Sequence, residues 1–146
     1  MKENQNLLSY NLYSGGEYEN STNGFYRINT NTNIITSNDY SVIGEQSFKI
    51  NIISDSTASL IIDRTTHNTG AILTGKLYIH VLSGSVTIRL QENTSGQKTD
   101  VVVNEGSDGL INISHTVSST QQAQFLIIPQ GEGTSYYIDN ISLTTS

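Results

Sequence analysis

Titratable and nucleophilic side chains are few in this 146-residue chain, which holds 13 acidic residues, three His and no Cys. Without Cys there is no disulfide framework and no thiolate metal site. The His residues stand at positions 67, 80 and 115. This wide spacing matches no zinc motif such as His-Glu-x-x-His, which sets two imidazoles on one metal. We therefore expect no zinc centre.

No catalytic motif frames the acidic residues. A glycoside hydrolase needs two carboxyl groups about 5–9.5 Å apart across a cleft, and an apolar setting that raises the pKa of the acid. Glu17 and Glu19 lie in a polar stretch, and Asp100 and Asp108 bracket another, without such a setting. A Gly-x-Ser-x-Gly elbow and a phosphate loop are also missing from the sequence. These features favour a protein that is not an enzyme.

The charge balance argues against two kinds of partner. Seven Lys and Arg against 13 Asp and Glu give a net charge of −6, with no basic cluster. A nucleic-acid binder needs a basic stripe to neutralise phosphates, and anionic membranes attract basic segments. No apolar run approaches the roughly 20 residues of a membrane span. We expect no nucleic acid and no membrane insertion, and a neutral ligand suits this chain better.

The start of the chain bears on location. Residues 1–6 show none of the apolar character of a signal peptide. Two interpretations stay open: a chain made without a leader, or a domain taken from a larger protein. In either case we expect a place outside the cell, on a cell surface or in a virion.

Alternation of apolar and polar residues with a period of two predicts β-strands along the chain. The clearest lie at 47–52, 76–81, 85–91, 122–127 and 137–143, and less regular ones at 6–10, 24–28, 57–63, 100–104 and 110–117. Gly-containing turns separate them, and residues 11–40 are the least regular stretch. Within it, the Asn- and Thr-rich residues 29–33 form either a surface loop or an edge strand. About ten short strands predict an all-β fold, a two-sheet antiparallel β-sandwich formed by residues 1–146 as a single domain.

Several segments carry a resemblance to a known family. They are Asn-Leu-Leu-Ser at 6–9, Gly-Glu-Gln-Ser-Phe-Lys-Ile at 44–50, Gly-Lys-Leu-Tyr at 75–78 and Tyr-Tyr-Ile-Asp-Asn-Ile-Ser-Leu at 136–143. Together they resemble the carbohydrate-binding modules of families 4, 9 and 22, which accompany xylanases and cellulases. The resemblance implies a jelly-roll topology and a polysaccharide or cell-surface glycan as ligand. The chain departs from the family in having no Trp, and Tyr13-Ser14 stands where the family has Phe-Glu.

A jelly roll of this order implies one sheet built from the strands near 57–63, 122–128, 85–91 and 100–104. Its outward positions would form a ligand surface. The polar candidates there are Asp63, Arg89, Gln91 and Gln124. A sugar also needs an apolar platform for its C–H face, which Tyr26 and Tyr40 could supply from the irregular stretch. The alternative is an ordinary solvated sheet face.

The same resemblance implies a structural calcium ion, held by the Asp139 carboxylate and by backbone oxygens near Glu45. Calcium takes six to eight oxygen ligands. The alternation of the final strand phases Asp139 inward, where an unpaired charge is costly and requires a partner. A metal ion, a basic side chain or a set of N–H donors would serve, so a hydrogen-bonded structural Asp is the alternative.

Two functions therefore stay open. One is a glycan-binding module that tethers a larger multidomain protein. The other is a structural or receptor-binding module of a phage tail or surface adhesin, without sugar binding of its own. The absence of Trp and the Asn- and Thr-rich composition favour the second. Tyr78 and His80 share a strand face, and they form either a second patch or a packing contact.

Overall fold

The protein, seen in a computed structural model, is described at residues 5–9, 26–27, 32–37, 39, 47–52 and 60–146. These residues form the strands β1 (Gln5–Ser9), β2 (Tyr26–Arg27), β3 (Thr32–Ser37), β4 (Ser47–Ile52), β5 (Leu60–His67), β6 (Ile72–Ser83), β7 (Ser85–Glu92), β8 (Lys98–Asn104), β9 (Asp108–Thr116), β10 (Gln121–Pro129) and β11 (Ser135–Thr145). In the described part of the chain, no helix is long and apolar enough to cross a membrane.

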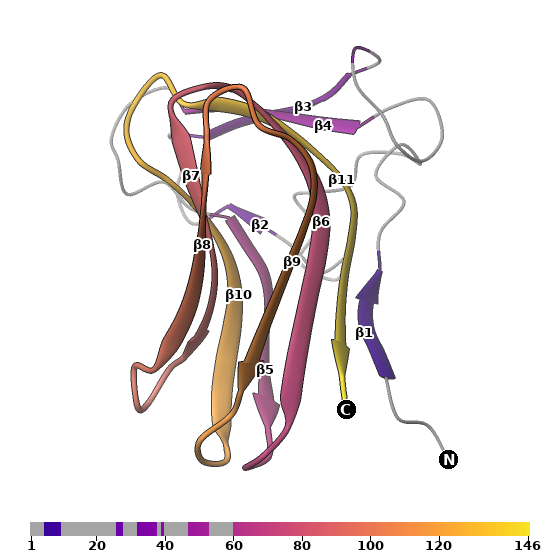
Figure 1. Ribbon diagram of the computed structural model, residues 1–146, viewed down its shortest axis with the longest axis vertical. Helices are drawn as coiled ribbons and strands as arrows, with labels where there is room; N and C mark the ends of the chain where they lie inside the picture. The colour runs from indigo at the N-terminus through magenta and orange to yellow at the C-terminus, as the bar shows by residue number, and fades with distance from the viewer. Residues whose placement is uncertain (1–4, 10–25, 28–31, 38, 40–46, 53–59) are drawn as a thin grey trace.

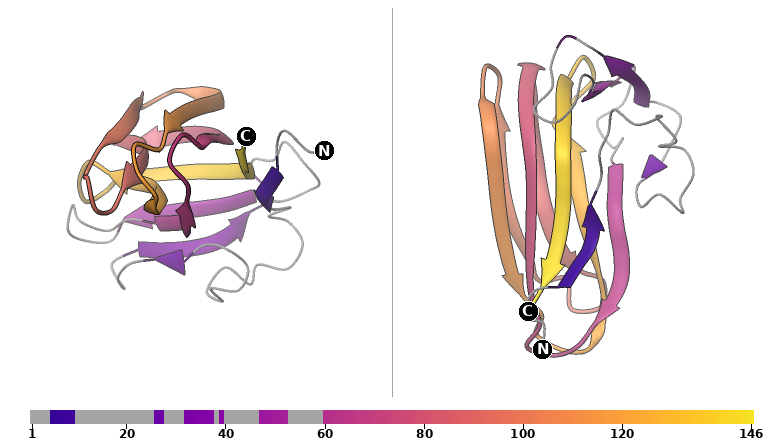
Figure 2. Two further views of the ribbon diagram at one scale, coloured as in Figure 1. Left: turned by 90° about the horizontal axis from the view of Figure 1, so that it is seen from below. Right: turned by 90° about the vertical axis from the view of Figure 1, so that its right-hand side faces the viewer.

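The strands lie in two facing sheets (Figures 1 and 2). The six-stranded sheet has the order β3-β4-β11-β6-β9, with β1 also paired to β11, and the five-stranded sheet has the order β2-β5-β10-β7-β8. All pairings between these described strands are antiparallel. The predicted all-β, two-sheet sandwich is confirmed. So is the prediction that the strands here numbered β5, β10, β7 and β8 share one sheet.

Alternating side chains from both sheets meet in the core. Val86, Ile88 and Leu90 of β7 are fully buried, and they belong to the same cluster as the inward residues of β6. Each buried aliphatic side chain of this kind contributes roughly 1.5–3 kcal/mol. The sheets approach closely where the ring of Phe125 on β10 lies against Gly75 on β6, since a Cβ at Gly75 would stand 2.7 Å from the ring's Cζ.

Strand β11 shares one of its edges between two partners. Strand β4 pairs with it at residues 135–138, and β1 pairs with it at 142–145. Between these stretches the register with β6 shifts, and Asn140 adopts a left-handed φ of 50°. This irregularity places Asp139 at the gap between the two partner strands. Figure 1 shows β1 beside the C-terminal half of β11.

Candidate functional site

The outward side chains of β10, β7 and β8 form a continuous surface on the five-stranded sheet, here called the ligand face. Antiparallel partners point to the same side of a sheet, so the register arranges these residues in rows across the strands. In order along the sheet the rows are Gln124-Gln91-Lys98, Leu126-Arg89-Asp100, Ile128-Thr87-Val102 and Gln130-Ser85-Asn104. Three of the residues predicted from the sequence, Arg89, Gln91 and Gln124, therefore lie together.

Gln91 and Gln124 are direct cross-strand partners, and both are half-buried. Side chains at such positions have Cβ atoms about 4.5–5.5 Å apart. Each amide carries two N–H donors and one carbonyl acceptor. The pair can therefore both donate hydrogen bonds to, and accept them from, the hydroxyl groups of a polar ligand.

Arg89 lies in the next row and is held by Asp100. Its Nε donates to Oδ1 at 2.7 Å and its Nη2 donates to Oδ2 at 2.9 Å. The hydrogen bonds of this pair raise the pKa of Arg89 and lower the pKa of Asp100. The guanidinium retains N–H donors that the pair does not use, so it can contact a ligand from a fixed position while its charge is neutralised.

Asp100 is a site residue that sequence reasoning missed, because it was weighed only as half of a possible acid pair. The signal was available. Asp100 and Arg89 stand at outward positions of adjacent strands joined by a short turn, and pairing Gln91 with Lys98 sets them opposite each other. The pair shows that the charges on this part of the face cancel.

The apolar part of the face lies beside Arg89. Leu126 is its cross-strand partner and is 7% exposed, whereas Val102 in the neighbouring row is 59% exposed. The backbone register continues this row outward, since Leu126 pairs with Ile61 on β5 and Ile61 pairs with Tyr26 on β2. Tyr26 is thus placed in the row of Arg89, although only its backbone is described.

The alternation of residues in β5 predicts that Asp63 lies at an outward position, but the register of β5 with β10 differs from this prediction. A bulge in β5 sets Ile61 opposite Leu126 but Asp63 opposite Phe125, a core residue, and Arg64 opposite Gln124. The bulge therefore interrupts the alternation that would put Asp63 and Ile61 on the same side of the sheet. Arg64, and not Asp63, stands in the row of Gln124. The ligand role of Asp63 stays a prediction, and Tyr40 and Glu45 lie outside the described residues.

Asp139 is completely buried, but not in the core. It alternates with the core residue Ile138 and pairs with Tyr78, whose neighbours Leu77 and Ile79 point inward. The expectation of an inward phase was wrong, because Asp139 belongs to the outer side of the six-stranded sheet. Its Oδ1 accepts a hydrogen bond from the backbone N–H of Asn140 at 2.8 Å.

Ser47 stands close to Asp139 in the fold, since the ladder of β4 and β11 ends at Phe48 and Ile138, one residue from each. Ser47 is 0% exposed, and among the described residues its Oγ has no hydrogen-bond partner. Carboxylate and neutral oxygen donors are the ligands calcium prefers, so a buried hydroxyl without a partner fits the implied ion. Among the described residues there is no group of three acidic, His or Cys side chains that would hold a metal.

A second buried carboxylate, at Glu92, also escaped sequence reasoning. Glu92 ends β7 in phase with the core residues Val86, Ile88 and Leu90, and this phase was the available signal. His115 Nε2 lies 2.6 Å from its Oε2, and Gln121 Nε2 donates to its Oε1 at 2.7 Å.

Two loops also bond to the Glu92 carboxylate. Ser95 Oγ donates to Oε1 at 2.9 Å, and the backbone N–H of Ser118 donates to Oε2 at 3.1 Å. Burial by itself raises the pKa of Glu92, but the hydrogen bonds from Ser118, His115 and Ser95 lower it to about 2. The carboxylate joins the β7–β8 turn to the β9–β10 turn, inside the sandwich and away from the ligand face.

No protein-family model and no curated protein matches this chain. Solved structures do match. The xylan-binding CBM22-1 domain of Paenibacillus barcinonensis Xyn10C has 13% identity and a TM-score of 0.60 over 99% of this chain and 97% of that domain. The arabinose-bound α-L-arabinofuranosidase MgGH51 has 16% identity and a TM-score of 0.64 over 84% of this chain and 23% of that one. Tailspike protein 4 of bacteriophage CBA120 has 12% identity and a TM-score of 0.60 over 90% of this chain and 20% of that one.

These likenesses define the fold. The chain has the jelly roll of carbohydrate-binding modules of families 22 and 4, which it matches over most of its length. It corresponds to nearly the whole of an isolated module, but to only about a quarter or less of the arabinofuranosidase and the tailspike protein. Domains of this fold thus occur within multidomain enzymes and within phage tailspikes.

Proposed function

We propose that this chain is a non-catalytic module that binds a neutral polysaccharide or cell-surface glycan on its ligand face. The observation that carries the proposal is the placement of the Gln91–Gln124 amide pair directly beside the Arg89–Asp100 ion pair. Support comes from the matching domain of Paenibacillus barcinonensis, which is described as xylan-binding and covers 99% of the chain.

The chemistry of the face suits sugar hydroxyls. Amides accept and donate at once, and a fixed guanidinium adds donors that point from a rigid strand. The exposed Val102 provides an apolar side for the C–H groups of a pyranose, and Tyr26, in the row of Arg89, would add a ring to it. Because Asp100 neutralises Arg89, this ion pair adds no net charge to the face and does not itself call for an anionic ligand.

Screening the purified chain on an array of neutral plant, bacterial and host glycans tests this function. Retention on at least one uncharged glycan is expected, and its loss in a Gln91→Ala/Gln124→Ala variant would assign the binding to the ligand face. Asn112→Ala is the matched control, because Asn112 is an exposed amide on β9 of the other sheet. The absence of retention on every glycan would reject the function.

The proposal includes a structural calcium ion at the edge of the six-stranded sheet. Asp139 would supply a carboxylate, Ser47 its buried hydroxyl and the chain near Glu45 backbone oxygens. The buried Ser47 Oγ supports this arrangement. The ion would neutralise the buried Asp139 and hold β4, β11 and the chain leading into β4 together, at a distance from the ligand face.

A second candidate function is that of a structural or receptor-binding module in a phage tail or adhesin. The likeness to the tailspike protein of bacteriophage CBA120, over 90% of this chain, is the observation that favours it. Either function places the chain outside the cell, on a cell surface or in a virion. Light scattering separates the candidates, because a stable trimer without glycan binding would support the second.

A further inference from the structure

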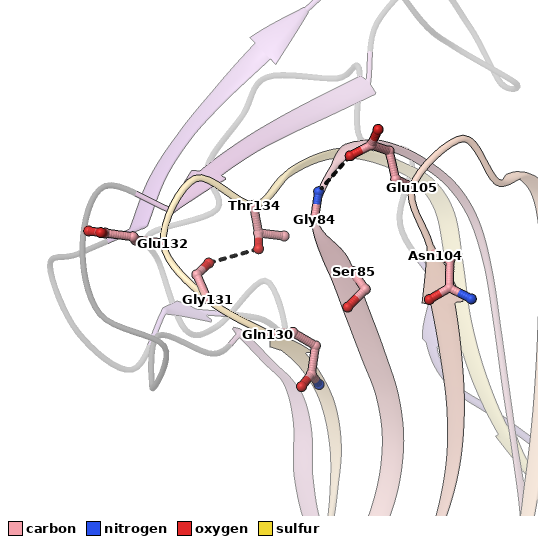
Figure 3. A pocket seen from close by; sticks show the side chains of 8 residues that line it. All are labelled: Gly84, Ser85, Asn104, Glu105, Gln130, Gly131, Glu132 and Thr134. Atoms are coloured by element: carbon pink, nitrogen blue, oxygen red, sulfur yellow. Dashed lines mark hydrogen bonds between the residues drawn. The ribbon is translucent and has the colours of Figure 1, made fainter.

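A hollow of about 440 Å³ lies at one end of the sandwich, where the β6–β7 hairpin, the end of β8 and the β10–β11 loop meet (Figure 3). Its size falls within the roughly 300–1,000 Å³ typical of small-molecule sites. The residues that line it are Gly84, Ser85, Asn104, Glu105, Gln130, Gly131, Glu132 and Thr134. None of the sequence-based site predictions fell here.

The hollow continues the ligand face. Ser85 pairs with Asn104, and the backbone N–H of Gln130 donates to the carbonyl of Ser85 at 3.0 Å. These three residues are therefore the last cross-strand row of the face. Figure 3 shows the Ser85 side chain between those of Gln130 and Asn104. A ligand lying along the face toward this end of the sheet meets the hollow.

The far side of the hollow is closed by two turns in contact. Gly84 adopts a φ of +77°, and a Cβ there would stand 2.6 Å from Thr134 Oγ1. The Thr134 hydroxyl donates to the carbonyl of Gly131 at 2.7 Å, and Ser83 Oγ donates to the carbonyl of Gly133 at 2.7 Å. The first bond lies within the β10–β11 loop, and the second ties the hairpin to the loop.

The loop is also tied to β4. The N–H of Ile52 donates to the carbonyl of Thr134 at 2.9 Å, and the N–H of Gly133 donates to the carbonyl of Ile52 at 3.0 Å. A site held by backbone hydrogen bonds loses little conformational freedom when a ligand binds. The hollow is therefore preorganised, and its wall stands across the end of the face.

The lining provides hydrogen-bonding groups. Gln130 Nε2 donates to Thr87 Oγ1 at 2.6 Å, which leaves its carbonyl oxygen to accept. Within the described part of the chain, no residue hydrogen-bonds to the Asn104 amide or the Ser85 hydroxyl. One oxygen of Glu105 accepts from the N–H of Gly84 at 3.2 Å, and the other is directed elsewhere.

The charge of the lining selects among ligands. Its charged members are Glu105 and Glu132, and Figure 3 shows Glu132 extending away from the other side chains. None of the described residues that line the hollow is Lys or Arg. An anionic ligand would be repelled, whereas a compact group with several hydroxyls would find donors and acceptors on neighbouring side chains.

We infer that this hollow binds the terminal unit of an uncharged sugar chain whose following units lie on the ligand face. The inference rests on the proposed glycan-binding function. It adds that the module recognises the end of the sugar chain. The hydroxyls of the terminal sugar unit contact Gln130, Ser85 and Asn104. The two turns in contact prevent the sugar chain from continuing past the hollow.

The test uses the full chain and the neutral polysaccharide retained on the array, cut into fractions of known length. Calorimetric titration of each fraction measures how many modules bind one sugar chain. If the hollow binds the end of the sugar chain, one module should bind each sugar chain whatever its length. If the face binds internal sugar units, the number of modules bound per sugar chain should grow with the length of the sugar chain. A growing number would overturn the inference and leave the proposed function intact.

Two substitutions assign the end site. Asn104→Ala and Ser85→Ala are each expected to weaken binding of the shortest fraction about threefold to tenfold, as loss of a hydrogen bond to ligand does. Asn112→Ala should leave it unchanged. Affinity retained in both hollow variants but lost in Gln91→Ala/Gln124→Ala would also reject the hollow. Failure of every neutral glycan to bind the unmodified chain would instead reject the function itself.

Discussion

Arg89 and Asp100 face each other across β7 and β8, joined at two points with side chains 22% and 30% exposed. Ion pairs at such exposure contribute little to folding, typically 0–1 kcal/mol. The pair matters because it cancels the charge of Arg89 on the ligand face, where the exposed Lys98 stands in the adjacent amide row.

Replacing Asp100 with Asn should therefore change ligand choice more than stability. The unpaired guanidinium of Arg89 would give the face a local positive charge, so glycans that carry uronic acids should gain affinity relative to neutral ones. A glycan array run at low and at physiological salt measures the change, because attraction between exposed charges weakens as salt rises. An unchanged ranking of acidic and neutral glycans would contradict this role of the pair.

Acid should weaken the fold through Glu92. Its folded-state pKa of about 2 lies below the ordinary value of 4.5, so the carboxylate stabilises the folded chain above pH 4.5. That contribution is lost as pH falls from about 4.5 toward 2, because the unfolded chain takes up the proton first. Urea denaturation at several pH values measures the loss.

Glu92→Gln should be less stable than the unmodified chain at pH 7 by roughly 1–3 kcal/mol, as for a broken buried hydrogen-bond network. The free energy of unfolding of this variant should also fall less steeply below pH 4.5 than that of the unmodified chain. Glu132→Gln is the control, since Glu132 is an exposed loop carboxylate. Parallel pH profiles for Glu92→Gln and the unmodified chain would count against the low pKa.

Gly75→Ala should destabilise the sandwich because the new Cβ meets the ring of Phe125 at 2.7 Å. Overpacking of this kind costs about 1–3 kcal/mol. Gly131→Ala adds the same methyl group where no atom lies within 4 Å, so it should leave the free energy of unfolding nearly unchanged. Adding Phe125→Leu to Gly75→Ala should make the two losses less than additive, and strict additivity would show that the contact is not the cause.

Calcium should raise the melting temperature of the unmodified chain, and a chelator should lower it. Any ion that binds only the folded state stabilises it in this way. Asp139→Asn and Ser47→Ala are expected to weaken the response to calcium, while Asp108→Asn, an exposed carboxylate on β9, should not. Equal melting temperatures with calcium and with chelator would reject the ion and leave Asp139 as a structural Asp that accepts the N–H of Asn140.

The strands could be predicted from the sequence wherever one face is buried. Val86, Ile88 and Leu90 repeat with a period of two and are all fully buried. Around strand β3 the sequence left a surface loop and an edge strand as alternatives, because Asn31, Thr32 and Asn33 carry no apolar alternation. The structure shows the edge strand. An edge strand has one neighbour and needs less apolar surface.

Local alternation failed at two irregularities of the backbone. The bulge in β5 moves Asp63 out of phase with Ile61, and the register shift in β11 leaves Asp139 buried on the outer side of its sheet. Such irregularities depend on which strand lies alongside, and a single segment of sequence does not contain that information. The hollow at the sheet end was missed for the same reason, since three separate turns build it.

Glycan binding by the ligand face is tested by calorimetric titration of the array's best neutral glycan into the unmodified chain and into Gln91→Ala/Gln124→Ala. The unmodified chain should bind measurably, and the double variant should bind at least tenfold more weakly, since two hydrogen-bonding amides are removed. Asn112→Ala should bind as the unmodified chain does. Binding of equal strength in the double variant would contradict the ligand face, even if the fold is unchanged.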